Sequence, residues 1–186
     1  MALFDRERDG GRLDFRLAVN GPVTLFWRQS LFVEAVEWLR RHDYTVAAFE
    51  ARSWESDDDL HRDFAAVLSF PSYYGRNLDA LNDCMRDVVN YDYGTSREAA
   101  GLALAFDGYD VFARRRPRTA RIVLDILADQ ARRAMLTGHR ILCLVQSDSP
   151  TIAFEPVGAT PVLWNQSEWL DDRRKPGSAA PGLVNE

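Results

Sequence analysis

The sequence predicts an α/β fold, with a mainly parallel β-sheet packed against helices. Apolar runs of strand length alternate with segments whose apolar residues recur every three or four positions. Hydrophobic residues make up 46 % of the 186 residues and charged residues 27 %, as in soluble globular proteins. No stretch approaches the roughly 18 consecutive apolar residues of a membrane span, and the charged start lacks the apolar centre of a signal peptide. We therefore expect a cytoplasmic protein that does not contact a membrane.

The first expected elements are a strand, a helix and a second strand. Residues 23–27 follow a Gly-Pro pair and are mostly β-branched or aromatic, which predicts a strand. Ser30 can cap a helix whose apolar residues recur at three- and four-residue spacing as far as Arg41. Residues 45–49 predict the second strand. Residues 1–12 are charged and broken by glycines, so we interpret them as a loose end.

Two helices are expected next. The first begins near Asp58 and ends at Pro71, and the second covers residues 78–89. The second helix has one apolar face, formed by Leu78, Leu81, Cys84, Met85 and Val88. Its opposite face carries three stacked carboxylates, Asp79, Asp83 and Asp87.

The remaining chain continues the alternation of strand and helix. A strand at 102–106, a long helix at 119–137 and a strand at 141–145 follow in order. A short apolar run at 162–164 can add a strand at one edge of the sheet. Residues 171–186 are rich in charge, Pro and Gly and are interpreted as a flexible tail.

The net charge of −5 is concentrated in one quarter of the chain. Residues 50–94 hold ten acids and four arginines and so carry −6, while the rest of the chain carries +1. Such a field attracts basic partners and repels phosphate backbones, so we expect no nucleic-acid binding through this region. The alternative is a solvated acidic face without a partner.

The sequence lacks the familiar signatures of enzymes. It contains no GxGxxG, GxxxxGK[ST], HExxH or GxSxG motif. His42, His61 and His139 lie at expected helix ends or turns and are interpreted as solvated or capping residues. Cys84 and Cys143 have no Cys or His at ligand spacing and are interpreted as reduced, buried thiols. We therefore expect no catalytic residue, no metal and no cofactor.

The segment Phe70-Pro-Ser-Tyr-Tyr-Gly-Arg-Asn-Leu-Asp-Ala-Leu-Asn-Asp-Cys84 is the most informative part of the sequence. Gly75 permits a turn, and Asn77 can cap the helix that follows. Tyr73 and Tyr74 precede an acidic helix start, a composition that favours a binding surface for a basic protein. The alternative is that both tyrosines only pack the turn against the core.

This segment resembles the barstar-like family of intracellular ribonuclease inhibitors. The family carries a P-x-Y-Y-G-x-N-L-D-A-L-x-D-C run, and the chain matches each of its named positions between Pro71 and Cys84. The upstream Asp59-Leu60-His61 also recurs in the family. The similarity covers residues 45 to 146, a little over half of the chain.

The resemblance implies a fold, a function and a set of contact residues. The expected fold is a barstar-like α/β fold with three parallel core strands, one or two added strands and packed helices. In the family, the loop tyrosine and the helix aspartates fill a nuclease active site, where carboxylates replace RNA phosphates. The residues expected to bind the partner are Tyr73, Tyr74, Gly75, Asn77, Asp79, Ala80, Asn82, Asp83, Arg86 and Asp129.

Three positions depart from the family prototype. Asn82 stands where the prototype has Trp, before the aspartate that dominates binding, here Asp83. Arg76 replaces an acid in the loop. A glutamate on the prototype's last helix has two candidate counterparts, Asp125 and Asp129. These differences favour a different nuclease target or a relative that does not inhibit.

The sequence therefore predicts three regions and a non-enzymatic function. The regions are a strand–helix extension at 1–44, a barstar-like domain at 45–150 and a C-terminal extension with a tail at 151–186. The expected partner is a basic secreted ribonuclease, or alternatively another basic protein such as a different toxin or a regulator. A hydrolase that uses Asp79 or Asp83 with His61 is the weakest alternative, because no nucleophile–base pair is visible. The oligomeric state is left open.

Overall fold

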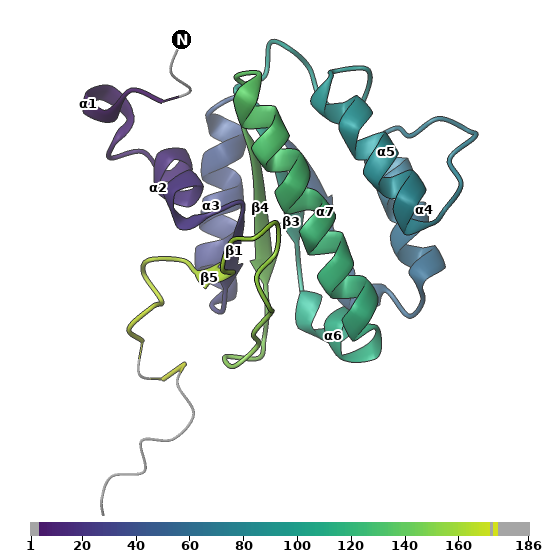
Figure 1. Ribbon diagram of the computed structural model, residues 1–186. Coiled ribbons are helices and arrows are strands. Elements are labelled where there is room, and N and C mark those ends of the chain that lie inside the picture. The colour runs from purple at the N-terminus through teal and green to yellow at the C-terminus, as the bar shows by residue number, and fades with distance from the viewer. Residues whose placement is uncertain (1–3, 172, 175–186) are drawn as a thin grey trace, which may run out of the picture.

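The computed structural model describes residues 4–171, 173 and 174 and places a five-stranded sheet between two layers of helices (Figure 1). The strands are β1 Val23–Phe26, β2 Tyr44–Phe49, β3 Gly101–Phe106, β4 Ile141–Gln146 and β5 Leu163–Trp164. They lie in the order β2-β3-β4-β1-β5, and every neighbouring pair is parallel. This confirms the predicted α/β fold with a parallel sheet, in which β1 and β5 are added beside β4 to the three core strands β2, β3 and β4.

Helices cover both faces of the sheet. The longer ones are α2 Leu13–Asn20, α3 Gln29–Arg41, α4 Asp57–Val67, α5 Leu78–Val89 and α7 Pro117–Leu136. The shorter ones are α1 Arg6–Asp9, α6 Tyr109–Arg115 and the 3₁₀ turn Ala51–Ser53. In Figure 1, α7 lies in front of the sheet with α5 beside it, and α3 lies on the opposite side.

Two hydrophobic clusters lie between the sheet and the helices, one on each face. Alternate residues of β3 show the division, since Leu102, Leu104 and Phe106 join the cluster under α4, α5, α6 and α7. Ala103 and Ala105 face the second cluster, under α2 and α3. Every residue of β3 and β4 is buried, as expected for parallel strands covered on both faces. The apolar runs in the sequence thus became the central strands.

Local sequence determines where several elements begin. Ser56 and Asp59 form a reciprocal capping box at the start of α4, and the Ser56 hydroxyl helps to lower the pKa of Asp59 to about 2. Asn77 caps α5, as predicted, and Pro117 occupies the first turn of α7. The helix predicted at residues 78–89 is confirmed at both ends.

The start of α3 differs from the prediction. Ser30 lies inside the helix, and the preceding Arg28 offers no side-chain cap. The cap comes instead from Glu168, a fully buried residue far along the chain. Its carboxylate oxygens accept hydrogen bonds from the backbone N–H groups of Trp27 (3.0 Å) and Arg28 (2.8 Å). A carboxylate at this position also suits the helix dipole.

Other sequence-based expectations are corrected by the structure. The segment 1–12 contains α1, and Asp9 is buried rather than part of a loose end. Helices α2 and α6 were not predicted. The flexible tail predicted at 171–186 lies almost entirely outside the described residues. Among the described helices, none is both long and apolar enough to cross a membrane.

The two predicted extensions share one sheet with the central region. β1 pairs with β4 on one side, with Val23 opposite Cys143, and with β5 on the other. Asn165 donates its backbone N–H to the carbonyl of Leu25 at 2.8 Å. The segments before and after the central region therefore meet at the β1–β5 edge.

Candidate partner-binding surface

The loop between α4 and α5 leads directly into the acidic helix. It closes with a hydrogen bond from the Tyr74 N–H to the Pro71 carbonyl at 2.9 Å. The Asn77 side chain then accepts the Ala80 N–H at 2.8 Å and starts α5. The loop and the exposed side of α5 form one continuous surface, which we call the α5 surface and which comprises Tyr73 and the exposed residues from Arg76 to Arg86.

The two adjacent tyrosines have opposite orientations. Tyr73 is 80 % exposed, whereas Tyr74 is only 9 % exposed and belongs to the main core. The Tyr74 hydroxyl is hydrogen-bonded to Nδ1 of His61 at 2.5 Å, and its ring packs edge-on against Phe70. Burial raises the pKa of Tyr74 well above its usual range. Tyr74 thus supports the loop from beneath, and Tyr73 offers the free ring.

The turn itself does not use Gly75 as the sequence suggests. Arg76, at φ 48°, is the residue in the left-handed conformation, and Gly75 has no positive φ. Gly75 matters for space instead, because an added Cβ would lie 3.3 Å from the Asn77 amide and 3.5 Å from Ala80. Gly75 and Asn77 are exposed and Ala80 is half-buried, so all three lie at or near the surface.

The three stacked aspartates differ in their surroundings. Asp79 is exposed and has no hydrogen-bond or ion-pair partner within the described part of the chain. Asp83 is also exposed and pairs with Arg86 at 2.8 Å. Asp87 is half-buried and accepts a hydrogen bond from the Tyr93 hydroxyl at 3.1 Å. Only Asp79 and Asp83 therefore offer accessible carboxylates.

Asn82 connects the α5 surface to α7. Its Oδ1 accepts a hydrogen bond from Nε2 of Gln130 at 2.8 Å. Gln130 is almost fully buried, and its own Oε1 has no partner in the described structure. The position where the family prototype has a large apolar ring is thus occupied here by a polar contact between two helices.

The two candidate acids of α7 have separate roles. Asp125 accepts the backbone N–H of Gly158 at 2.7 Å, so it holds the C-terminal segment. Asp129 is partly exposed and pairs with Arg132 (2.9 Å) and Arg133 (2.8 Å). The hydrogen bond from Arg133 is the largest cause that lowers the pKa of Asp129. The charge of Asp129 is therefore compensated by two arginines of its own helix.

Two residues that support this surface were not identified as such from the sequence. His61 was interpreted as solvated but is 2 % exposed and holds Tyr74. Gln130 was not considered, although it anchors Asn82. His61 lies close to Leu60 and Phe64 on α4, and this spacing could have indicated that His61 is buried. No local pattern indicates the role of Gln130.

The histidine and cysteine predictions have mixed outcomes. His42 ends α3, as expected, and its Nδ1 lies 2.7 Å from the Trp38 carbonyl. His139 was expected to be solvated but is 2 % exposed. Cys84 and Cys143 are both free and buried, which confirms the prediction. Burial raises the pKa of each thiol. The Cys84 side chain is buried beside the α5 surface and does not form part of it.

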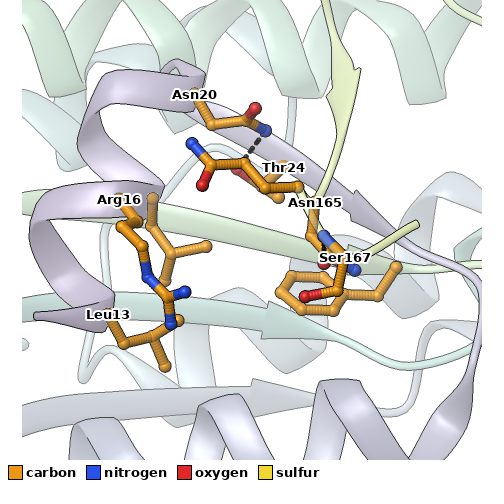
Figure 2. A pocket seen from close by; sticks show the side chains of 9 residues that line it. Leu13, Arg16, Asn20, Thr24, Asn165 and Ser167 are labelled. Atoms are coloured by element: carbon orange, nitrogen blue, oxygen red, sulfur yellow. Dashed lines mark hydrogen bonds between the residues drawn. The ribbon is translucent and has the colours of Figure 1, made fainter. Parts of the chain in front are cut away.

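One cavity of the described structure lies away from the α5 surface, between α2, β1 and the segment 165–167. Figure 2 shows Asn20 above it, bonded to Thr24 at 3.1 Å. It has only about 40 Å³ of space for water, so it is too small for an organic substrate. No group of three or more potential metal ligands occurs among the described residues.

A comparison with protein families identifies the region of the chain that contains the α5 surface. The family model described as Barstar (barnase inhibitor) matches residues 44–146, which is more than half of the chain. The chain belongs to the barstar family. Its barstar domain includes β2, β3, β4 and every helix that carries or supports the α5 surface.

One curated relative shares part of this domain. It is a Bacillus subtilis (strain 168) protein named "Putative ribonuclease inhibitor YrdF", and it is 53 % identical over 41 residues. The match covers 22 % of this chain and 45 % of the relative, so it spans less than half of that protein. The barstar family assignment therefore rests mainly on the match of residues 44–146.

Proposed function

We propose that this protein is an inhibitor, not an enzyme, and that it blocks the active site of a basic secreted ribonuclease with its α5 surface. The observation that carries the proposal is the contrast between Tyr73 and Tyr74. Tyr74 is fixed in the core by His61, and this places the exposed Tyr73 beside the acidic start of α5. Membership of the barstar family and the relative named as a ribonuclease inhibitor support the same function.

The proposed mechanism is competitive. Ribonuclease clefts bind RNA phosphates through Arg, Lys and His side chains, and a carboxylate can accept the same hydrogen bonds. Asp79 is available without any rearrangement, whereas Asp83 must exchange Arg86 for a cation of the nuclease. This exchange costs little, because an exposed ion pair contributes only about 0–1 kcal/mol. The ring of Tyr73 then covers the mouth of the cleft.

A second function remains open because the α5 surface is not uniformly acidic. Arg76 and Arg86 lie among the aspartates, and Asn82 presents an amide where the family prototype presents an apolar ring. These features favour a partner with acidic as well as basic groups. The alternative is a barstar-like interaction module that binds another basic protein, such as a different toxin or a regulator, without inhibiting a ribonuclease.

An RNA-cleavage assay tests the proposal. The full chain is mixed with barnase, the nuclease in the family's description, and with other basic ribonucleases captured from culture supernatants. We expect equimolar chain to stop cleavage by at least one of them, and the Asp83→Ala variant to restore it. Glu34→Ala is the matched control, since it removes an exposed carboxylate from α3 on the opposite layer.

The two functions predict different results. Complex formation without loss of RNA cleavage would favour the interaction module. Inhibition that is equally strong in the Asp83→Ala and Glu34→Ala variants would contradict the role of the α5 surface. The proposed site of action is the cytoplasm of the producing cell, where the inhibitor would protect cellular RNA.

A further inference from the structure

A buried glutamine of α7 lies beneath the α5 surface. Gln130 is 1 % exposed, and its Nε2 donates a hydrogen bond to Oδ1 of Asn82 at 2.8 Å. The same nitrogen lies 3.5 Å from the backbone carbonyl oxygen of Asn82. The other end of the Gln130 amide, Oε1, is buried and has no partner among the described residues. Within the described structure, the Gln130 side chain is therefore held by Asn82.

This contact sets the orientation of the Asn82 amide. An asparagine amide carries its accepting oxygen and its two N–H donors on opposite sides of one planar group. Because Oδ1 is directed at Gln130, Nδ2 is directed away from it. Asn82 is half-buried, and its Nδ2 is exposed to solvent without a hydrogen-bond partner among the described residues. The α5 surface thus presents the donor end of this amide.

The donor lies close to two accessible carboxylates. Asp79 precedes Asn82 by about one turn of α5, and Asp83 follows it directly. On the α7 side, Asp129 is compensated by two arginines of its own helix. The surface therefore combines two available acceptors with one N–H donor. This pattern is complementary to a protein surface on which cationic side chains surround a hydrogen-bond acceptor.

We propose that Gln130 is a positioning residue that holds the Asn82 amide with its N–H groups outward, and that these groups recognise a hydrogen-bond acceptor in the nuclease cleft. The acceptor is a carbonyl, amide or carboxylate oxygen beside the cations that pair with Asp79 and Asp83. A nuclease with an apolar group at this point is disfavoured, because a buried donor without a partner costs free energy. This inference rests on the proposed function, since it names the chemistry of the partner at the same surface.

The Asn82→Asp variant tests the donor. The new side chain has the same shape and keeps an oxygen for Gln130, but it replaces the N–H groups with a second oxygen and adds a negative charge. A surface that attracts a basic nuclease by charge alone should bind more tightly after this change. Loss of the donor should instead weaken binding, by a factor on the order of ten.

Binding is measured by titration calorimetry with the ribonuclease that the chain inhibits most strongly, and barnase is the first candidate. The measurement is made at about pH 7.5, where the added carboxylate is ionised. Asn90→Asp is the matched control, because it adds the same charge at the exposed end of the same helix, outside the α5 surface. This control should not weaken binding. Binding by Asn82→Asp that equals or exceeds that of the wild-type chain would overturn the proposal.

The Gln130→Met variant tests the positioning. Methionine has a similar volume but no N–H donor, and it removes the unpartnered Oε1, so the melting temperature should not fall. Nuclease binding should weaken several-fold because the Asn82 amide loses its fixed orientation. A glutamine with only a structural role would instead affect stability and leave binding unchanged.

A double variant checks that Gln130 acts through Asn82. Once Asn82→Ala has removed the amide, Gln130→Met should cause no further loss of binding, because no amide is left to orient. Unchanged binding in Gln130→Met alone, or losses that add in the double variant, would overturn the positioning role.

Nuclear magnetic resonance of the free chain tests the orientation without a partner. The Nε2 protons of Gln130 are buried and bonded, so they should exchange slowly with solvent, whereas the exposed Nδ2 protons of Asn82 should exchange rapidly. The reverse order would show that the Asn82 amide has the opposite orientation and would overturn the proposal. If barnase and the captured ribonucleases do not bind the chain, the proposed function fails, and the acceptor on a nuclease fails with it. The exchange rates still decide whether Gln130 orients Asn82.

Discussion

Asp83 is an exposed carboxylate whose position is set by an ion pair. It lies on the exposed side of α5 and is held by Arg86 rather than by the core. Its carboxylate is therefore ordered but easily transferred to another cation. Asp79, one turn earlier, has no such partner among the described residues, and Asp87, one turn later, is already engaged by Tyr93.

The three aspartates should consequently differ in their effects on partner binding. We expect Asp83→Ala to cost about 3–5 kcal/mol, because it leaves cations of the partner buried and unpaired. Asp79→Ala should cost about 1.5–3 kcal/mol, the range of one charge-assisted hydrogen bond, and Asp87→Ala at most about 1 kcal/mol. Titration calorimetry against the captured nuclease measures these values, with thermal melts as the control for folding. Equal losses at the three positions would leave only a diffuse acidic patch.

The adjacent tyrosines allow a second test at this scale. Tyr74→Phe removes the hydroxyl that pairs with His61, and we expect it to lower the free energy of unfolding by about 1–3 kcal/mol. Tyr73→Phe is the matched control and should change stability by less than about 0.5 kcal/mol, because Tyr73 is exposed. Urea unfolding measures both. A stable Tyr74→Phe protein would mean that the buried hydrogen bond contributes little to the loop.

At the scale of elements, the start of α3 depends on a residue remote in sequence. The Glu168 carboxylate accepts hydrogen bonds from the backbone N–H groups of Trp27 and Arg28. No side chain at the N-cap position of α3 does so. The Asn165 amide is hydrogen-bonded to the same carboxylate. The helix and the C-terminal segment therefore stabilise each other.

Removal of this cap should be measurable as a loss of stability. We expect Glu168→Ala to lower the free energy of unfolding by about 1–3 kcal/mol, since two donors lose their acceptor. Glu155→Ala is a suitable control, because it removes an exposed carboxylate whose pair with Arg121 is on the surface. If both variants unfold at the same urea concentration as the wild-type chain, the cap is replaced by water at little cost.

The whole molecule consists of the barstar-family region together with the segments on either side. β1 supplies a neighbour for β4, and α2 and α3 build one of the two hydrophobic clusters. Without residues before 44, the side of β3 and β4 that carries Ala103, Ala105, Leu142 and Leu144 would face water.

We therefore expect the isolated segment 44–146 to lack cooperative folding. The measurement is a thermal melt followed by circular dichroism, in parallel with the full chain. The fragment should show a broad, weak transition because it exposes apolar surface that α3 and β1 cover. A sharp transition in the fragment would show that the family region is stable without its flanking segments.

The sequence predicted what is determined locally. Each buried strand reads as an apolar run, and the two faces of α5 follow from helical spacing with Asn77 as the cap. The motif led to the α5 surface, and the role of that surface in binding is a prediction. Contacts between remote residues could not be predicted. The burial of His61 beneath Tyr74, the bond from Gln130 to Asn82 and the cap from Glu168 depend on the packing of elements far apart in the chain.

The position of β1 in the sheet determines when this strand can pair with its neighbours during synthesis. β1 is translated before both of its neighbours in the sheet, β4 and β5, and before β2 and β3. Until Leu163 and Trp164 emerge, the first strand lacks a partner on at least one side. Loops of this length close slowly and leave strand edges open in the meantime. We therefore expect the unpaired edges of β1 to be accessible to chaperones and proteases from the translation of β1 until that of β5.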